Sequence, residues 1–266
     1  MNKPENKLEN KLKTMLQDQV VLNGWLHLPA PFAAEVMAHQ GWDSLTIDFQ
    51  HGPLDLGDVL AMIPVIQATK TSVIPRVPWN EPGTIMKLLD AGVEGIICPM
   101  INSRADCEAF IGACRYPPQG YRSYGPTRAA IHHGTAYAAS ANDFVLTMPM
   151  IESKQALENL EAILSVPGVD AVFVGPGDLG LDLYGEAKID RNDPAFLRIL
   201  EGIARAARAR GIAAGIFTGT VEYANQMTEL GFNFVTISSD ARLLALAAKA
   251  VVNAFKANSN AAKVGY

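Results

Sequence analysis

The stretch IDFQHGPLD, residues 47–55, places a carboxylate, Asp48, three residues before an imidazole, His51, directly after the apolar run SLTI. A carboxylate that orients an imidazole is a frequent arrangement in general acid–base catalysis. Because further polar residues follow neighbouring apolar runs, we predict that Asp48 and His51 form a catalytic pair. The alternative is a surface turn that carries a structural histidine.

Two more carboxylates follow apolar runs: Glu152 in TMPMIES and Asp178 in FVGPGD. A carboxylate in apolar surroundings is costly unless it is paired or bound to a metal, so the two predict a site for a divalent cation. Mg²⁺ or Mn²⁺ suits two carboxylates with water and substrate better than zinc, which prefers nitrogen and sulfur. The alternatives are a helix cap for Glu152 and a turn in a glycine-rich loop for Asp178.

The run SVIPRV contains Arg76, whose guanidinium requires an anion partner in apolar surroundings. That partner is either a substrate or a carboxylate of the fold. His27 lies near the end of another apolar run, but nothing pairs with it in sequence. His132 and His133 fall in a long polar stretch, where solvated or packing roles are expected. No lysine lies within an apolar run, which disfavours a Schiff-base aldolase.

The elements that must position these residues are eight apolar runs separated by segments of helical period. The runs are residues 20–28, 44–49, 72–77, 95–100, 144–151, 171–175, 213–218 and 234–238. The expected helices are residues 31–41, 55–67, 81–92, 104–115, 154–164, 194–211, 221–231 and 241–255. Nearly continuous apolar strands that alternate with helices favour a closed (β/α)₈ TIM barrel over an open doubly wound sheet. The candidate residues would then meet at the carboxyl ends of the strands.

No linker or repeat divides the chain, so we expect one α/β domain, the barrel of residues 20–257. Residues 1–19 form an amphipathic helical extension with its apolar residues at helical spacing, and residues 258–266 form a tail. Residues 116–143 make one long connection that is expected to be a lid or binding segment. The apolar positions of the extension are Leu8, Leu12, Met15 and Leu16.

Composition restricts the partners. The net charge is −5 and no dense Lys/Arg cluster occurs, which argues against nucleic acid and favours a small-molecule substrate. No run reaches the ~20 apolar residues of a membrane span, and we expect a cytoplasmic protein. The three cysteines form no CxxC motif and are expected to be reduced core thiols: Cys98, Cys107 and Cys114.

Several ordered blocks, taken together, resemble the HpcH/HpaI aldolases, the metal-dependent pyruvate aldolases that cleave 4-hydroxy-2-oxo acids such as 4-hydroxy-2-oxoheptanedioate. The blocks are IDxxHGP, RVPWNEP, KLLDAG, RYPPQGYRSYGPTRA, MIE and FVGPGDL, and the resemblance covers the chain from about Trp25 to Phe255.

The resemblance implies roles for named residues. Glu152 and Asp178 would hold Mg²⁺ or Mn²⁺, with Co²⁺ as a further option. Arg76 would stabilise the pyruvate enolate, and Asp48 with His51 would act as the general base through a metal-bound water. Further substrate contacts would come from Trp25, Gly177 and, from a neighbouring subunit of a homohexamer, Asp90.

Two positions depart from the family pattern and leave the aldehyde half of the substrate open. Residue 50 is Gln where many members have Glu, and residue 150 is Met where some aldolases have Gln. Phe217, Thr218 and Ser238 are candidates for that half of the pocket. The competing hypotheses are a citrate-lyase-like or malyl-CoA-lyase-like enzyme and a non-catalytic metabolite-binding barrel.

Overall fold

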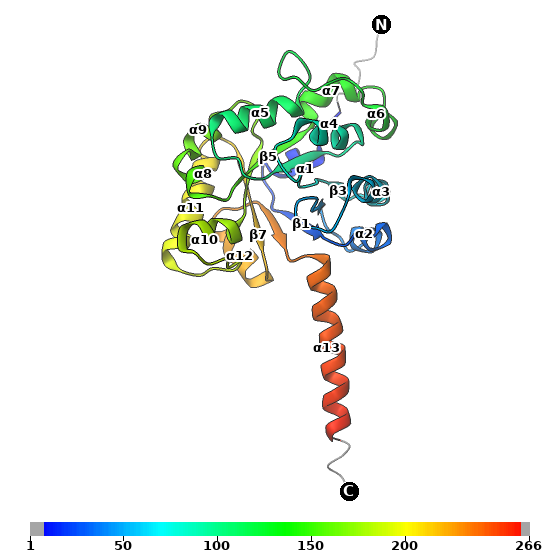
Figure 1. Cartoon of the computed structure of the whole chain (residues 1–266), viewed down its shortest axis with the longest axis vertical. Helices are drawn as coiled ribbons and strands as arrows, with labels where there is room; N and C mark the ends of the chain where they lie inside the picture. The colour runs from blue at the N-terminus through cyan, green and yellow to red at the C-terminus, as the bar shows by residue number, and fades with distance from the viewer. Residues whose placement is uncertain (1–7, 262–266) are drawn as a thin grey trace.

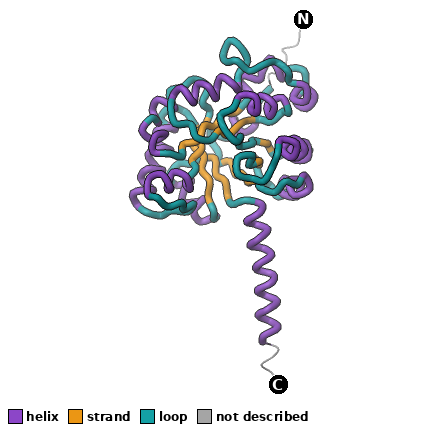
Figure 2. Tube along the Cα trace, viewed as in Figure 1, coloured by secondary structure: helices purple, strands orange, loops and turns teal. Residues whose placement is uncertain are grey.

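The computed structural model describes residues 8–261, with side chains as far as residue 257. Its strands lie at the centre and its helices surround them (Figures 1 and 2). All neighbouring strands pair in parallel, which confirms the predicted single-domain (β/α)₈ barrel. The strands are β1 Val21–Leu26, β2 Ser44–Ile47, β3 Ser72–Val73, β4 Gly95–Cys98, β5 Leu146–Ile151, β6 Ala171–Val174, β7 Ala213–Thr218 and β8 Phe234–Ile237.

Helices follow the strands in the expected alternation, with some additions. They are α1 Lys11–Met15, α2 Pro31–Ala38, α3 Leu56–Gln67, α4 Pro82–Asp90, α5 Arg104–Cys114, α6 Thr127–His133, α7 Tyr137–Phe144, α8 Lys154–Glu158, α9 Leu160–Leu164, α10 Pro176–Tyr184, α11 Pro194–Arg208, α12 Val221–Glu229 and α13 Asp240–Ala261. None of the helices within residues 8–261 is long and apolar enough to cross a lipid bilayer.

Strand β3 is much shorter than the run of residues 72–77 that predicts it. Pro75 has no N–H to donate, which interrupts regular pairing. The chain nevertheless continues between its neighbours, because Arg76 bridges to Asp48 on one side and to Ile97 on the other. These bridges complete the barrel between β3 and β4 and place the Arg76 side chain at the carboxyl end of the strands.

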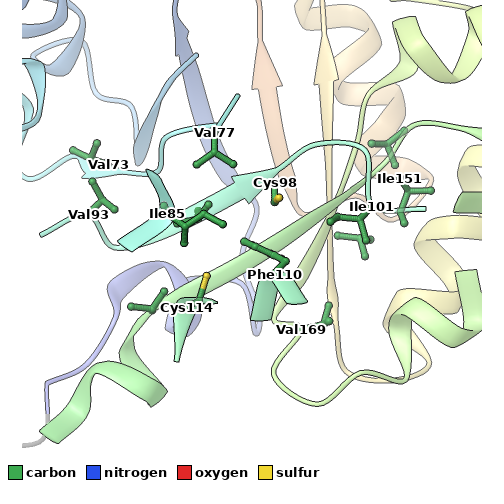
Figure 3. Close-up of a cluster of buried hydrophobic side chains, with 14 of the residues drawn as sticks. Val73, Val77, Ile85, Val93, Cys98, Ile101, Phe110, Cys114, Ile151 and Val169 are labelled. Carbon is green, nitrogen blue, oxygen red and sulfur yellow. The ribbon is translucent and has the colours of Figure 1, made fainter. Parts of the chain in front are cut away.

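The core has an inner and an outer layer. Inside the barrel, Trp25, Met148 and Phe173 pack with other strand residues. Between strands and outer helices lies a larger cluster, part of which Figure 3 shows, with Phe110 beside Cys98 and Cys114. All three cysteines are free and buried, as expected from the sequence, and burial raises the pKa of both Cys107 and Cys114 to about 12.

The N-terminal extension forms the short helix α1, which packs across the amino-terminal end of the barrel. Leu12 and Leu16 join the inner cluster. Asn10 caps the helix and also donates to the backbone oxygens of Glu94 and Phe144. Residues 1–7 of the predicted extension lie outside the described residues. The end of the barrel opposite the predicted site is therefore covered by the chain itself.

The connection of residues 116–143 contains two helices, α6 and α7, where the sequence shows no periodicity. His133 packs between Tyr137 and Phe144, and its Nε2 lies 2.8 Å from the Gly92 backbone oxygen. Burial lowers the pKa of His133 to about 4. This residue has the packing role that we expected for the loop histidines.

The last helix, α13, differs most from expectation. Its first turn lies beside β1, and the rest extends away from the barrel as a single rod (Figure 1). The helix continues to Ala261, into the segment predicted as a tail, and residues 262–266 lie outside the described residues. Its large apolar side chains are exposed: Leu243, Leu244, Leu246, Val251, Val252 and Phe255.

Candidate active site

A cavity of about 220 Å³ opens at the carboxyl ends of the barrel strands. It contains six of the eight predicted site residues together with several that the sequence did not identify. Its lining comprises Trp25, His27, Asp48, His51, Arg76, Met150, Phe173, Gly175, Pro176, Gly177, Asp178, Ile189 and Phe217. Glu152 and Asp90 are the two predicted site residues that this lining does not include.

Asp48 lies at the centre of the polar contacts and is completely buried. Its Oδ1 accepts from Arg76 Nε at 2.9 Å, and its Oδ2 accepts from Arg76 Nη2 at 2.7 Å. Trp25 Nε1 donates to Oδ2 at 3.1 Å, and His27 Nε2 lies 2.8 Å from the same oxygen. Burial by itself raises the pKa of Asp48. The hydrogen bonds from His27 and Arg76 outweigh burial and hold this pKa well below its usual range.

Arg76 is correspondingly fixed. Its guanidinium is paired in a two-point contact with Asp48 and lies over the Trp25 ring, with Cζ 4.9 Å from the ring centroid. The sequence left open whether the anion partner of Arg76 is a carboxylate of the fold, and the structure shows that it is. Nη1 has no hydrogen bond to the described residues, so one edge of the guanidinium remains for a ligand in the cavity.

His51 reaches the same cavity but is not oriented by Asp48 in the manner we expected. The two are linked through the backbone, since the His51 N–H donates to Asp48 Oδ1 at 3.3 Å. Within residues 8–261 the His51 ring makes no hydrogen bond, and the imidazole that Asp48 contacts is that of His27. The carboxylate has its lone pairs committed to Arg76, Trp25 and His27, which leaves no position for the His51 ring.

Glu152 follows the end of β5, and only 3% of it is exposed. Its Oε1 accepts from the Met100 N–H at 2.7 Å, and Met100 has a left-handed backbone with φ 54°. Burial, opposed by that hydrogen bond and assisted by the negative charge of Asp178, raises the pKa of Glu152 to about 7. Gly175 is required beside it, because a Cβ there would lie 2.6 Å from Oε2.

Asp178 is exposed in the first turn of α10, a helix that stands where the glycine-rich sequence predicted a turn. The signals for that helix were Pro176 at its start and Gly185, which ends it in the left-handed conformation. Asp178 borders both the cavity and a wider groove of about 770 Å³ that includes Glu152. The carboxylates of Glu152 and Asp178 therefore line the same groove.

These two residues fit a divalent cation. A buried carboxylate with a raised pKa beside a second carboxylate is stabilised by a positive ion. The described part of the chain brings together no group of three or more His, Cys, Asp or Glu side chains that could hold a metal. Two carboxylates with other positions left to substrate and water match the preference of Mg²⁺.

The hydrophobic wall of the cavity is built around Trp25. Its ring stacks on Phe173 with centroids 5.6 Å apart and meets Phe217 edge to face at 5.4 Å. Of the three candidates for the second half of the pocket, Phe217 lines the cavity. Thr218 and Ser238 are buried at strand ends outside its lining.

Asp90 lies outside this cavity, at the end of α4. Its Oδ1 accepts from Arg122 Nη2 at 2.7 Å, and the side chain of Arg122 is fully buried beside Tyr116 and Tyr137. Within the described chain Asp90 therefore neutralises a buried guanidinium.

Sequence reasoning missed the roles of two lining residues. His27 was noted for its place near the end of β1, but its partner Asp48 is 21 residues away. Ile189 lies in the segment between α10 and α11 and belongs to no motif. For His27 the signal was its position at a strand end, whereas nothing in the sequence marked Ile189.

The chain is similar to known proteins over nearly its whole length. The model of the HpcH/HpaI aldolase/citrate lyase family matches residues 22–247. A hydroxypyruvate/pyruvate aldolase of Rhizorhabdus wittichii is 39% identical over 244 residues, covering 91% of this chain and 97% of the relative. A 4-hydroxy-2-oxo-heptane-1,7-dioate aldolase of Escherichia coli is 34% identical over 262 residues, covering 97% of this chain and 99% of the relative.

Among solved structures, a HpcH/HpaI aldolase/citrate lyase family protein from Burkholderia cenocepacia has a TM-score of 0.87 and 32% identity. That similarity covers 93% of this chain and 99% of the other. Sequence and structure thus match over nearly their whole length, and the chain belongs to the HpcH/HpaI aldolase/citrate lyase family.

Proposed function

We propose that this protein, a carbon–carbon lyase, reversibly cleaves a 4-hydroxy-2-oxo acid into pyruvate and an aldehyde with the help of a divalent metal ion. Support comes from the names of the two curated relatives and from the polar groups of the cavity. The single observation that carries the proposal is the buried Arg76–Asp48 pair in the same small cavity as Asp178 and His51.

Glu152 and Asp178 would hold the ion, Mg²⁺ or Mn²⁺ in preference and Co²⁺ as a further option. When bound, the ion supplies positive charge that binds the 2-oxo acid and stabilises the charge developing on its keto oxygen. The N-terminus of α10 adds free backbone N–H groups at Gly177 and Asp178, which favour a carboxylate ligand.

Arg76 stabilises the enolate that forms when the bond between C3 and C4 breaks. Asp48 holds the guanidinium through Nε and Nη2, so Nη1 is the donor left for the developing oxyanion. A donor that is already in place costs no reorganisation during the reaction. Trp25 covers the face of the guanidinium, and its apolar ring limits the access of water to this contact.

His51 accepts the proton of the C4 hydroxyl, which must leave for the carbonyl of the aldehyde to form. Its imidazole lines the cavity without a hydrogen bond to the described chain, so both ring nitrogens are available to a ligand or water. Asp48 contributes to this base only by accepting a hydrogen bond from the backbone N–H of His51. Asp48 supports catalysis chiefly through Arg76.

Release of pyruvate from a short 4-hydroxy-2-oxo acid tests the proposal. We expect release in the presence of Mg²⁺ or Mn²⁺, its loss in EDTA, and its recovery when the ion is restored in excess. Activity that EDTA leaves unchanged would overturn the metal assignment. Cleavage of a malyl-CoA or citrate substrate in place of the hydroxy-oxo acid would favour the other branch of the family.

We also propose that the protein acts as a homo-oligomer, a hexamer as the sequence resemblance implies. The rod-like part of α13 supports this, since it extends away from the barrel (Figure 1) and its large apolar side chains are exposed. Exposed apolar area of this kind is typical of an interface between subunits. A contribution of Asp90 to a neighbouring subunit's site would have to accommodate its ion pair with Arg122.

A further inference from the structure

The imidazole of His27 is fixed at the site by its contact with Asp48. An ionised carboxylate can only accept hydrogen bonds, so His27 Nε2, 2.8 Å from Asp48 Oδ2, carries the hydrogen. The other ring nitrogen, Nδ1, makes no hydrogen bond to the described residues. The contact with Asp48 therefore fixes which nitrogen of His27 remains for a ligand.

The backbone beneath this ring is also fixed. The N–H of His27 donates to Asp240 Oδ1 at 2.8 Å, and the N–H of Leu28 donates to Asp240 Oδ2 at 3.2 Å. Asp240 is itself buried at the start of α13. A side chain that is held at both ring and backbone has the preorganisation expected of a recognition group.

His27 differs chemically from the wall around it. About a third of its side chain is exposed, and it lines the same cavity as the apolar side chains of Phe217 and Ile189 and the ring of Trp25. Three apolar side chains offer no hydrogen bond to a polar substituent, whereas an imidazole nitrogen does. A hydroxyl group can donate to neutral Nδ1 and can accept from it when the ring is protonated.

We infer that His27 is a specificity-determining residue that selects a hydroxyl-bearing substrate through a hydrogen bond between that hydroxyl and Nδ1. The inference rests on the proposed aldolase function and names the substrate class more narrowly. The hydroxyl belongs either to the aldehyde, as in a 2-hydroxyaldehyde, or to C3 of the 2-oxo acid. Both sources present the same group to His27, and the experiment separates them.

The test uses pairs of substrates in which a hydroxyl replaces a methyl of similar size. With pyruvate as donor, glycolaldehyde is compared with propanal. With propanal as acceptor, hydroxypyruvate is compared with 2-oxobutanoate. The ratio of kcat/KM within each pair is measured for the wild-type enzyme and for His27→Leu, with saturating Mg²⁺ or Mn²⁺.

We expect His27→Leu to lower kcat/KM for the hydroxylated member of one pair by about 10- to 100-fold, because a lost hydrogen bond within a built site is discriminating. Its methyl counterpart should fall only by the smaller, uniform factor that the loss of one donor to Asp48 Oδ2 also produces in Trp25→Phe. The pair that responds identifies the source of the hydroxyl. His27→Gln, which keeps a donor and an acceptor, should restore part of the preference and provides a second variant if His27→Leu folds poorly.

Trp25→Phe serves as the matched comparison, since it also removes one donor to Asp48 Oδ2 but leaves His27 in place. It should lower all four reactions to a similar degree. An equal loss of all four reactions in His27→Leu would show that His27 only supports Asp48 and would overturn the inference, as would unchanged ratios in both pairs. A wild-type enzyme that is inactive in every arm and in pyruvate release would overturn the proposed function itself.

Discussion

Arg76 and Asp48 form a buried two-point ion pair across the end of neighbouring strands, with Nε–Oδ1 at 2.9 Å and Nη2–Oδ2 at 2.7 Å. Each charge offsets part of the desolvation cost of the other, and the two-point contact fixes the plane of the guanidinium. It also assigns Asp48 a different role from the one its sequence spacing indicated. In the proposed reaction, the carboxylate positions the guanidinium that meets the substrate.

Replacing Arg76 with Lys keeps the charge but loses the planar fork that Asp48 holds. We expect the kcat for pyruvate release to fall by at least about 100-fold, because an ammonium cannot keep two contacts with Asp48 and present a third donor to the oxyanion. Steady-state kinetics with circular dichroism of the folded variant provide the measurement. Wild-type turnover in Arg76→Lys would reduce the pair to a structural one.

His51→Ala should separate two reactions of the same site. Aldol cleavage requires removal of the C4 hydroxyl proton and should fall by roughly 10²–10⁴-fold. Decarboxylation of oxaloacetate needs no such base and should persist, since Arg76 and the ion still stabilise the enolate. Both rates are measured on one preparation with saturating Mg²⁺ or Mn²⁺. A parallel loss of the two rates would contradict the role of His51 as base.

Glu152→Gln and Asp178→Asn should each lower pyruvate release at least about 100-fold and weaken the response to added Mn²⁺, because each removes one of two protein ligands. Glu158→Gln is the matched control, since Glu158 lines the same groove but pairs with Lys154. Titration of activity with Mn²⁺ after treatment with EDTA compares the three. Ordinary Mn²⁺ dependence in both ligand variants would end the assignment of the metal site.

Glu94, at the amino-terminal end of the barrel, should make stability depend on pH. Burial, opposed by a hydrogen bond from the Val73 N–H, raises the pKa of Glu94 to about 7 from 4.5. A carboxyl whose pKa is raised on folding favours the folded state below its unfolded pKa, and this contribution is lost as pH rises through about 7.

Glu94→Gln should therefore gain stability relative to wild type between pH 4.5 and pH 8, on the order of 1–3 kcal/mol. Denaturant unfolding of both proteins across this pH range gives the difference between their free energies of unfolding. The other titrating groups are common to both proteins, so their contributions cancel. Glu108→Gln, at an exposed carboxylate that pairs with Arg104, is the matched control for the loss of one charge. A difference independent of pH for Glu94→Gln would contradict the assignment.

One face of α13 carries the exposed side chains of Leu244, Val251 and Phe255, and this face should hold subunits together. Leu244→Glu combined with Val251→Glu places two charges on that face and should shift the protein to smaller species in light scattering after gel filtration. Lys249→Glu alters charge on the same helix without removing apolar area and should leave the assembly intact. A monomeric wild-type protein at micromolar concentration would contradict the proposed oligomer.

Several features of this protein are determined by local sequence. Alternation of apolar runs with segments of helical period predicts the barrel, because strand and helix periods are properties of neighbouring residues. Parallel strands in a barrel present their carboxyl ends on one face, so Asp48, Arg76, Glu152 and Asp178 could be assigned to that face without a structure. The helix of Pro176–Tyr184 was also marked locally, by Pro176 and Gly185, although its glycines suggested a turn.

Which groups contact one another depends on how distant segments pack. Asp48 stands three residues from His51 but pairs with Arg76 and His27, because hydrogen bonds depend on directions across β1, β2 and the bridge at residue 76. Likewise, the amphipathic pattern of residues 241–255 predicts a helix but not the surface against which it packs. An apolar face can be buried equally well against its own barrel or against another chain. Periodicity specifies which face each segment must bury. The packing of distant segments decides which surface covers that face.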